Sequence, residues 1–391
     1  MTSVPPRRVA LLGSTGSIGR NTLDVIASLP DRLQVVALAA GDNVEEMTLQ
    51  VARFRPALAS MRTAAAAEAL RKSLRAQGID RTEILHGAEG LLAAATASGV
   101  NLLVAATVGV ASLAAIAAAL ERGCDLALAN KEALVVAGTI LMDLACRGGS
   151  AILPVDSEHS AIHQCLRGGA PAEVERLVLT ASGGPLLRLP ASEMEAVTPA
   201  QALRHPTWNM GARISLDSAT MMNKGFEIIE ACHLFGVRED QVEVLVHPQS
   251  IVHSMVEFTD GSVLAQLGTA DMRTPIQYAL TYPERVPSAR IRLKLEEVNK
   301  LEFEAPDETR FPCLRLARQA LRAGGGAAAV LNAADEVAVG AFRQGQITFP
   351  GIARVVDRTL QELGAPAVAS VEEIQALDAR ARRAALACIR A

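Results

Sequence analysis

The sequence has no excess of positive charge. Its 38 lysine and arginine residues are outnumbered by 42 aspartate and glutamate residues, which gives a formal net charge of −4 and a pI near 6.0. A protein that mainly binds nucleic acid usually has a basic surface, so this composition argues against that partner. Half of the 391 residues are hydrophobic and 20% are charged. Such a chain is globular and long enough for two or three domains.

The chain also lacks paired cysteines. Its six cysteines are scattered, and none of them forms a CxxC pair. The N-terminal residues show no signal-peptide pattern. Scattered thiols of this kind are typical of a reducing compartment, so we expect a cytoplasmic protein.

Charged residues are absent between Gly90 and Leu120, a stretch longer than the roughly 20 residues that a transmembrane helix needs. However, polar residues and glycines interrupt the stretch, and no aromatic residue marks a membrane interface. The pattern fits a buried strand over 102–106 and an alanine-rich helix over 111–120 better. We therefore predict no membrane partner.

Lysine is rare, because it supplies only five of the 38 basic residues. Arginine is the usual choice of this chain, so a lysine indicates a position that needs a compact, single-point ammonium group. Lys131 and Lys224 lie within two of the motifs that carry candidate functional residues.

The N-terminal part alternates apolar strands with helices. Strands are expected at 8–12, 33–39, 57–60, 83–85, 102–106 and 125–128, with a helix after the first strand to about residue 27 and alanine-rich helices between the others. This alternation predicts a parallel sheet with helices on both faces. We expect residues 1–150 to form the first domain.

After about residue 150 the pattern changes. Strands are expected at 178–180, 242–246, 251–258 and 262–267, and Asp260-Gly261 is typical of a hairpin turn between the last two. These strands predict a second α/β or α+β domain over 151–290. Residues 291–312, rich in charge and proline, are interpreted as a linker. Helical patterns at about 313–322, 327–343, 350–362 and 371–389 predict a small bundle over 313–391.

Three glycines follow the first strand at a spacing of three residues: Gly13, Gly16 and Gly19. A glycine-rich turn between a strand and a helix lets the backbone approach the pyrophosphate of a dinucleotide at the helix N-terminus. The alternative is a tight turn without a ligand. The position of these glycines between the first strand and the first helix favours nucleotide binding.

The end of the second strand carries information about the type of nucleotide. Gly41-Asp42-Asn43 follows it. An acidic residue there usually binds the ribose of NAD, whereas a basic neighbour accommodates the additional phosphate of NADP. Asp42 taken alone therefore favours NAD.

Residues 154–159 read Pro-Val-Asp-Ser-Glu-His after an apolar segment. In an extended chain, Asp156 and Glu158 would point the same way. Two like charges at one point repel each other unless a cation lies between them, and carboxylate oxygens suit a hard divalent cation. The alternative is a polar strand end that faces water.

Two segments have the composition of ligand-binding loops. Asn130-Lys131-Glu132 follows the strand 125–128 at the sheet edge where ligands bind, but a helix start capped by Asn130 would explain it equally well. The small-residue loop at 182–185 suits an anion held by backbone amides and the Ser182 hydroxyl, and its alternative is a plain turn.

Two later segments add polar groups. Residues 204–211 contain the only tryptophan and are interpreted as a mobile loop that closes over a ligand, the alternative being a loop anchored to the core by Trp208. In 217–227, Ser218, Asn223 and Lys224 are candidates for a phosphate monoester, and Glu227 is a candidate third carboxylate for the metal. Together, the motifs predict metal-assisted redox chemistry on a phosphorylated, oxygen-rich substrate.

Seven segments together resemble the 1-deoxy-D-xylulose 5-phosphate reductoisomerases, the NADPH-dependent enzymes of the non-mevalonate isoprenoid pathway. They are GSTGSIG at 13–19, ANKE at 129–132, LPVDSEH at 153–159, SGGP at 182–185, RHPTWNMG at 204–211, DSATMMNKGFE at 217–227 and HPQSIVHSM at 247–255. They occur in the family's order and span essentially the whole chain. The resemblance implies an α/β protein with an N-terminal Rossmann-like NADPH domain, a central catalytic domain, a C-terminal helical bundle and a homodimeric state.

The resemblance also implies roles for individual positions. Mg²⁺ or Mn²⁺ would be bound by Asp156, Glu158 and Glu227. The substrate would be held by Lys131, Ser157, Ser182, His205, Ser218, Asn223 and Lys224. NADPH would contact Thr15, Gly16, Ser17, Ile18, Gly41, Asp42, Asn43, Asn130, Glu132 and Gly211.

Some positions depart from the family's pattern. Asp42 stands where a basic or small residue is frequent, which weakens recognition of the 2′-phosphate, yet we expect NADPH to be preferred over NADH. Ala133 and Leu186 replace a common serine and phenylalanine without removing a charge. On a regular strand Ser157 would face away from its acidic neighbours, so a substrate contact by Ser157 requires the segment to turn there.

In the implied reaction, the cation chelates the oxygens of 1-deoxy-D-xylulose 5-phosphate, the carbon skeleton rearranges to a branched aldehyde, and NADPH reduces it to 2-C-methyl-D-erythritol 4-phosphate. Lys131, Glu158 and His205 are the catalytic candidates, the first two for proton transfer. The sequence leaves open whether the skeleton rearranges by retro-aldol cleavage or by a ketol shift. The alternatives in function are another metal-dependent NAD(P) enzyme and a non-catalytic dinucleotide-binding protein.

Overall fold

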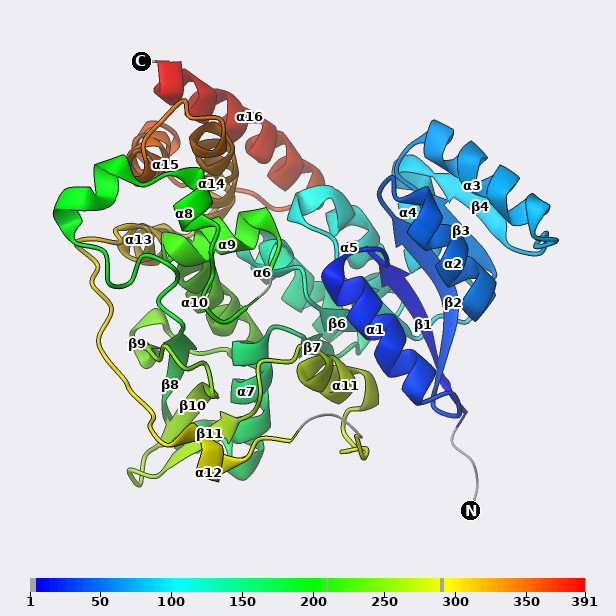
Figure 1. Ribbon diagram of the computed structural model, residues 1–391, viewed down its shortest axis with the longest axis horizontal. Helices are drawn as coiled ribbons and strands as arrows, with labels where there is room; N and C mark the ends of the chain where they lie inside the picture. Colours follow the sequence, from blue (N-terminus) through cyan, green and yellow to red (C-terminus); the bar gives the residue numbers. More distant parts are fainter. Residues whose placement is uncertain (1–4, 209, 289–291, 391) are drawn as a thin grey trace. The chain divides into compact units, whose positions relative to one another are not determined.

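The computed structural model describes residues 5–208, 210–288 and 292–390, and its chain divides into two compact units (Figure 1). The first unit comprises 1–133, 139–160 and 271–288, and the second comprises 134–138, 161–270 and 289–391. Residue 209 of the predicted loop and residue 291 of the predicted linker lie outside the described residues. So do the start of the first predicted domain (1–4) and the ends of the second (289–290) and the last (391).

The first unit is built on a seven-stranded parallel sheet in the order β4-β3-β2-β1-β5-β6-β7. The strand order reverses beside β1, and ligands of doubly wound sheets bind outside the carboxyl ends of the strands at such a point. The predicted Rossmann-like parallel sheet is therefore confirmed. Its strands are β1 (Arg7–Leu12), β2 (Leu33–Ala40), β3 (Leu58–Met61), β4 (Glu83–His86), β5 (Leu102–Ala105), β6 (Asp125–Leu128) and β7 (Ile152–Pro154).

Apolar side chains on both faces explain why these strands form a parallel sheet. The last four residues of β1 and all four residues of β5 are buried, as expected of strands covered by helices on each side. The stretch without charges thus contains β5 and α5, as predicted. The covering and connecting helices are α1 (Ser17–Ser28), α2 (Val44–Phe54), α3 (Ala64–Ala76), α4 (Gly87–Ala95), α5 (Leu113–Glu121), α6 (Lys131–Gly148) and α11 (Arg273–Thr281). The helix α7 (Ser157–Cys165) begins in the first unit and continues into the second from residue 161.

The second unit contains a four-stranded sheet in the order β11-β10-β8-β9. The strand β8 pairs antiparallel with β10 and parallel with β9, and β10 and β11 form the hairpin predicted around Asp260-Gly261. In this turn the Ser262 backbone N–H donates to the Asp260 carboxylate at 2.9 Å. The strands are β8 (Val174–Ala181), β9 (Val242–Val246), β10 (Val252–Phe258) and β11 (Val263–Leu267).

Helices complete the second unit. The four predicted C-terminal helices are confirmed as α13 (Cys313–Ala323), α14 (Ala327–Arg343), α15 (Phe349–Leu363) and α16 (Val371–Arg390), and α14 packs against both α15 and α16 (Figure 1). The helix α13 packs on α10, so the strands and the C-terminal helices share one unit. The boundaries at 290 and 313 stay a prediction. The remaining helices are α8 (Pro199–Ala202), α9 (Ala212–Ala219), α10 (Met222–Phe235) and α12 (Leu295–Val298).

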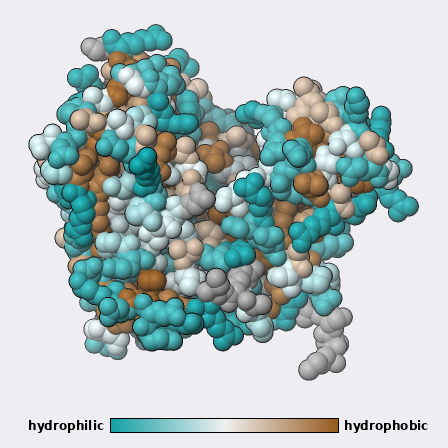
Figure 2. All heavy atoms as spheres, viewed as in Figure 1, coloured by the Kyte–Doolittle hydropathy of each residue, from teal (hydrophilic) through white to brown (hydrophobic). Residues whose placement is uncertain are grey.

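The surface is mixed in polarity. On the face drawn in Figure 2, hydrophilic side chains cover much of the surface, and hydrophobic ones lie in separate patches. None of the helices in the described residues combines the length and the apolar character needed to cross a membrane.

Candidate active site

The glycine-rich turn lies at the carboxyl end of β1 and leads into α1. Gly13 has a φ of 86°, and a Cβ atom there would lie 2.3 Å from the Ala106 carbonyl oxygen. A Cβ on Gly19 would lie 2.3 Å from the Gly13 oxygen, so both positions require glycine. Among the described residues, no side chain caps the N-terminus of α1. Its first backbone N–H groups therefore remain available for a phosphate.

The segment that follows β2 is held by side-chain contacts, unlike the glycine-rich turn after β1. The Asn43 side chain accepts a hydrogen bond from the Glu46 N–H at 3.1 Å and caps α2. The Asp42 carboxylate forms an ion pair with Arg62, which directly follows β3. Arg62 is thus a basic neighbour at the nucleotide edge of the sheet. Sequence reasoning missed it, although the rule that drew attention to Asp42 applies equally to the residue after β3.

The Asn130-Lys131-Glu132 segment begins α6. The Asn130 Oδ1 accepts from the Ala133 N–H at 2.9 Å, and its Nδ2 donates to the Thr107 and Gly109 carbonyl oxygens at 2.8 and 2.9 Å. The Glu132 carboxylate accepts from the Gly109 N–H at 3.2 Å. The helix-cap interpretation is therefore confirmed. These bonds also tie the start of α6 to the loop that follows β5, at the carboxyl edge of the sheet.

The acidic run is a turn and not a straight strand. The strand β7 ends at Pro154, and α7 begins at Ser157. The extended geometry first considered for Asp156 and Glu158 is therefore wrong, and the turn required for Ser157 is present. Lys131 Nζ lies 2.5 Å from the Asp156 carboxylate, and the Ser157 hydroxyl donates to Glu158 at 2.5 Å. The Lys131 side chain is only 9% exposed, so its ammonium and the Asp156 carboxylate form a largely buried pair.

In the second unit, Ser182 follows β8 in a loop that two glycines shape. Gly183 and Gly184 have positive φ values of 81° and 68°, and a Cβ on Gly184 would lie 2.7 Å from the Ser218 carbonyl oxygen. Glycine thus lets this loop approach α9 closely. The Ser182 hydroxyl accepts from the Gly184 N–H at 3.3 Å and lies 2.8 Å from the His205 Nε2. The structure therefore brings Ser182, His205 and Ser218 into one region.

The helix α10 presents the other predicted groups of the second unit. Asn223 and Lys224 lie in its first turn, and Glu227 lies one turn later. The Asn223 amide donates to the Glu227 carboxylate at 2.6 Å, and Lys224 forms an ion pair with the same carboxylate. The Glu227 and Lys224 side chains are 0% and 4% exposed. A buried charge pair of this kind is typical of a functional site and not of a solvated helix face.

The loop 204–208 is anchored to the second unit. The Trp208 ring lies 6.3 Å from the His253 ring, centroid to centroid, and Trp208 is half-buried. The backbone N–H groups of Thr207 and Trp208 donate to the His205 Nδ1 at 3.2 and 2.9 Å. These contacts support the anchoring alternative for the tryptophan. Movement of the loop over a ligand stays a prediction.

A buried charge cluster supports α9, and sequence reasoning missed it. Arg213 pairs with Asp217 on α9 and with Asp335 on α14, each at 2.8 Å. Burial and the nearby Asp217 raise the pKa of the Asp335 carboxyl well above its usual value, and Arg213 opposes the shift. The spacing of four residues between Arg213 and Asp217 was the available signal. The cluster fixes the helix that carries Ser218 against the C-terminal helices.

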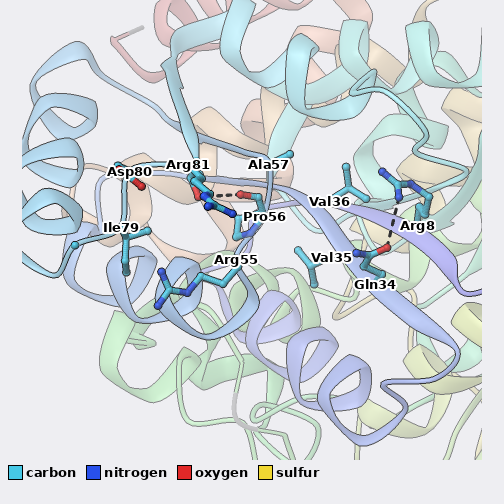
Figure 3. A pocket seen from close by; sticks show the side chains of 12 residues that line it. Arg8, Gln34, Val35, Val36, Arg55, Pro56, Ala57, Ile79, Asp80 and Arg81 are labelled. Carbon is cyan, nitrogen blue, oxygen red and sulfur yellow. Dashed lines mark hydrogen bonds between the residues drawn. The ribbon is translucent and has the colours of Figure 1, made fainter.

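A pocket of about 540 Å³ lies elsewhere in the first unit (Figure 3). Its lining includes Arg8, Gln34, Ala57 and Arg81, which lie at or just before the amino ends of β1 to β4. The glycine-rich turn is at the carboxyl ends of the same sheet. The pocket is therefore distinct from the candidate nucleotide site.

Comparison with known proteins identifies the family. Three family models match the chain: 1-deoxy-D-xylulose 5-phosphate reductoisomerase over residues 9–138, the C-terminal domain of that enzyme over 152–235, and the DXP reductoisomerase C-terminal domain over 267–384. The reductoisomerase of Moorella thermoacetica is 56% identical over 97% of each chain, and that of Geobacter metallireducens is 51% identical over 96% of this chain and 97% of its own.

Solved structures agree with this result. The reductoisomerase of Zymomonas mobilis in complex with NADPH matches with a TM-score of 0.92 and 43% identity, covering 98% of this chain and 99% of its own. A DOX-P reductoisomerase in complex with NADPH, fosmidomycin and magnesium matches with a TM-score of 0.92 and 42% identity over 98% of each chain. With the motifs in order along nearly its whole length, the chain belongs to the 1-deoxy-D-xylulose 5-phosphate reductoisomerase family.

Proposed function

We propose that this chain converts 1-deoxy-D-xylulose 5-phosphate to 2-C-methyl-D-erythritol 4-phosphate with NADPH and a divalent metal ion. The similarity to named reductoisomerases over 97% of the chain carries the proposal. A relative of the same fold binds NADPH, fosmidomycin and magnesium. A protein that only binds a dinucleotide would not need the buried Lys224–Glu227 pair or the Ser182–His205 contact.

Asp156, Glu158 and Glu227 are the proposed metal ligands. Their carboxylate oxygens are the donor type that Mg²⁺ and Mn²⁺ prefer. In this structure Lys131 pairs with Asp156 and Lys224 pairs with Glu227, so these largely buried carboxylates have positive partners whose place a divalent cation would take. These residues therefore fit a divalent cation. When bound, such an ion supplies Lewis-acid polarisation of the substrate's oxygens.

Residues of the second unit are proposed to hold the substrate phosphate. Ser182, Ser218, Asn223 and Lys224 offer two hydroxyls, an amide and an ammonium, and the His205 ring holds the Ser182 hydroxyl. Gly183 and Gly184 bring the Ser182 loop against the backbone of Ser218, which supports a shared anion site. Ser157 at the start of α7 is proposed to contact the reacting end of the substrate.

NADPH is proposed to lie along the carboxyl edge of the parallel sheet and to supply hydride there. The uncapped start of α1 suits its pyrophosphate. Asn130 and Glu132 fix the loop after β5, so their role includes shaping this edge. The full proposed set of contacts is Thr15, Gly16, Ser17, Ile18, Gly41, Asp42, Asn43, Asn130, Glu132 and Gly211.

Lys131 and Glu158 are proposed to move protons. The Asp156 carboxylate orients the Lys131 ammonium, and the Ser157 hydroxyl orients Glu158, so both groups have fixed positions near the proposed metal ligands. His205 is proposed to contribute by orienting Ser182 and the substrate.

We further propose a homodimer in a reducing cytoplasm, without nucleic-acid or membrane partners. The net charge of −4 argues against a nucleic-acid partner, and the six free cysteines are typical of a reducing compartment. The homodimer is proposed from the family resemblance alone. The division into a dinucleotide-binding domain (1–150), a catalytic and dimerisation domain (151–290), a linker (291–312) and a helical domain (313–391) belongs to the same proposal.

Glu158→Gln tests the metal assignment, because it keeps the size of the side chain and removes its charge. We expect weaker Mn²⁺ binding and a loss in kcat of about 100-fold or more, since Lewis-acid stabilisation contributes several kcal/mol. Mn²⁺ titration and NADPH oxidation measure the two effects. Glu243→Gln is the matched control, because this carboxylate pairs with Arg176 at the surface of β9.

An assay of NADPH oxidation by the wild-type protein distinguishes the reductoisomerase function from the alternatives. We expect NADPH oxidation only when both the sugar phosphate and the metal are present. Oxidation without the sugar phosphate, or none at all, would contradict the reductoisomerase assignment. Unchanged Mn²⁺ affinity and turnover in Glu158→Gln would contradict the role of Glu158 as a metal ligand. That result would leave the reductoisomerase assignment itself intact.

A further inference from the structure

Two oppositely charged residues, Asp42 and Arg62, lie side by side at the nucleotide edge of the first unit. Parallel pairing places Ala40 of β2 opposite Met61 of β3, so the residues that follow the two strands leave the sheet together. The Arg62 N–H donates to the Gly41 carbonyl oxygen at 3.2 Å, which fixes the backbone of Arg62 beside the end of β2. Both residues therefore occupy the region where the adenosine ribose of a dinucleotide binds.

The side chains of this edge form a small network. The Arg62 guanidinium pairs with the Asp42 carboxylate through Nη2, and the Thr63 hydroxyl donates to the other Asp42 oxygen at 3.4 Å. Both oxygens of the Asp42 carboxylate thus accept hydrogen bonds from neighbouring side chains. The Arg62 side chain is 72% exposed, and a guanidinium carries five N–H donors, so most of its donors face solvent.

An exposed ion pair contributes little to stability, so folding alone gives no strong reason for Arg62. Recognition of a phosphate gives a stronger reason for an arginine at this position. A guanidinium binds phosphate oxygens through paired, charge-assisted hydrogen bonds, and an arginine near the ribose accommodates the 2′-phosphate that distinguishes NADPH from NADH. Asp42 alone would favour NADH, but here its charge is offset by Arg62.

We propose that Arg62 binds the 2′-phosphate of NADPH and that Asp42 positions its guanidinium instead of selecting NADH. Arg62 is therefore a specificity-determining residue, and this role rests on the proposed use of NADPH. The departure from the family's pattern at position 42 then does not remove the positive charge from this edge. The charge is supplied by the neighbouring strand.

Arg62→Ala tests this role through binding of NADPH and NADH, which differ only in the 2′-phosphate, to the enzyme without substrate. Titration calorimetry should show a Kd for NADPH raised about 10- to 100-fold, the effect of losing hydrogen bonds to a charged group, and a Kd for NADH within about twofold of wild type. The Kd of Arg62→Lys for NADPH should lie between those of wild type and Arg62→Ala, because an ammonium keeps the charge but not the paired geometry.

Arg81→Ala is the matched control. Arg81 is an exposed arginine of the same unit, but it lines the pocket at the amino end of the sheet (Figure 3). It should leave both Kd values unchanged. An unchanged Kd for NADPH in Arg62→Ala, or an equal loss for NADPH and NADH, would overturn the proposal. Turnover of the sugar phosphate by the wild-type enzyme tests the reductoisomerase function separately.

Discussion

His205 illustrates how one side chain fixes both its loop and a neighbouring hydroxyl. Its Nδ1 accepts hydrogen bonds from the backbone N–H groups of Thr207 and Trp208. In the neutral ring the proton must then be on Nε2. That N–H donates to the Ser182 hydroxyl at 2.8 Å, which leaves the hydroxyl hydrogen of Ser182 free to turn towards an anion.

His205→Ala should lower kcat/KM for the sugar phosphate about 10- to 100-fold, because it removes a hydrogen bond in a proposed site for a charged group and loosens the loop. Steady-state kinetics measure this loss, and the Kd for NADPH should change little, since the contacts of His205 lie in the second unit. His205→Asn keeps an acceptor for the loop N–H groups and should recover part of the loss. Equal kinetics in wild type and His205→Ala would show that Ser182 needs no partner.

At this scale, local chemistry was predictable and distant pairing was not. The cap formed by Asn130 was foreseen as one of two interpretations, because caps depend on neighbouring residues. The Asp42–Arg62 pair joins residues 20 positions apart and depends on β2 lying beside β3. A single sequence specifies such a pair only after the strand order is known.

Among the elements, amphipathic helices were predicted best. The four C-terminal helices begin and end within about a residue of their expected bounds, because their apolar stripes repeat locally. The strand β8 was predicted over 178–180 but extends over Val174–Ala181. Its first half contains the exposed, charged residues Glu175 and Arg176, and Arg176 pairs there with Glu243 and Glu257 of the neighbouring strands. Cross-strand ion pairs leave no apolar pattern, so the sequence did not reveal this half.

The helix α16 allows a matched test of this packing. Ile374 is 1% exposed on the face towards the bundle, whereas Leu386 on the same helix is 45% exposed. Ile374→Ala should lower the free energy of unfolding by about 2–5 kcal/mol, through lost burial and the cavity that remains. Leu386→Ala should change it by less than about 0.5 kcal/mol. Urea unfolding followed by circular dichroism measures both, and similar effects of the two substitutions would contradict the assigned face.

For the whole molecule, the class of each sheet followed from the sequence, but the strand order did not. Alternating strands and helices predicted the parallel sheet. Its order β4-β3-β2-β1-β5-β6-β7 depends on the side of the sheet to which each crossover adds the next strand, which the sequence pattern does not specify. The segment 271–288 shows the same limit. It follows the strands of the second unit in sequence, yet it belongs to the first unit, where α11 packs on α1.

Buried thiols give the whole molecule a characteristic response to alkaline pH. Burial, with a smaller effect of Asp125, raises the pKa of Cys124 from 9.0 to about 11, and burial with Glu239 raises that of Cys232 to about 12. Above pH 9 the unfolded chain loses these protons while the folded chain keeps them. Stability is therefore unaffected by these thiols below pH 9 and falls as pH rises towards 11–12.

Cys124→Ser should accordingly flatten the fall in unfolding free energy between pH 9 and 10.5, by up to about 1.4 kcal/mol per pH unit, because one linked proton is removed. Urea titrations at a series of pH values measure this slope, and only the slope matters, since the substitution also changes stability at pH 8. Cys146→Ser is the control, because Cys146 is exposed on α6. If Cys124→Ser and wild type had the same slope, the Cys124 thiol would ionise equally in the folded and unfolded chains, and its burial would not protect the proton.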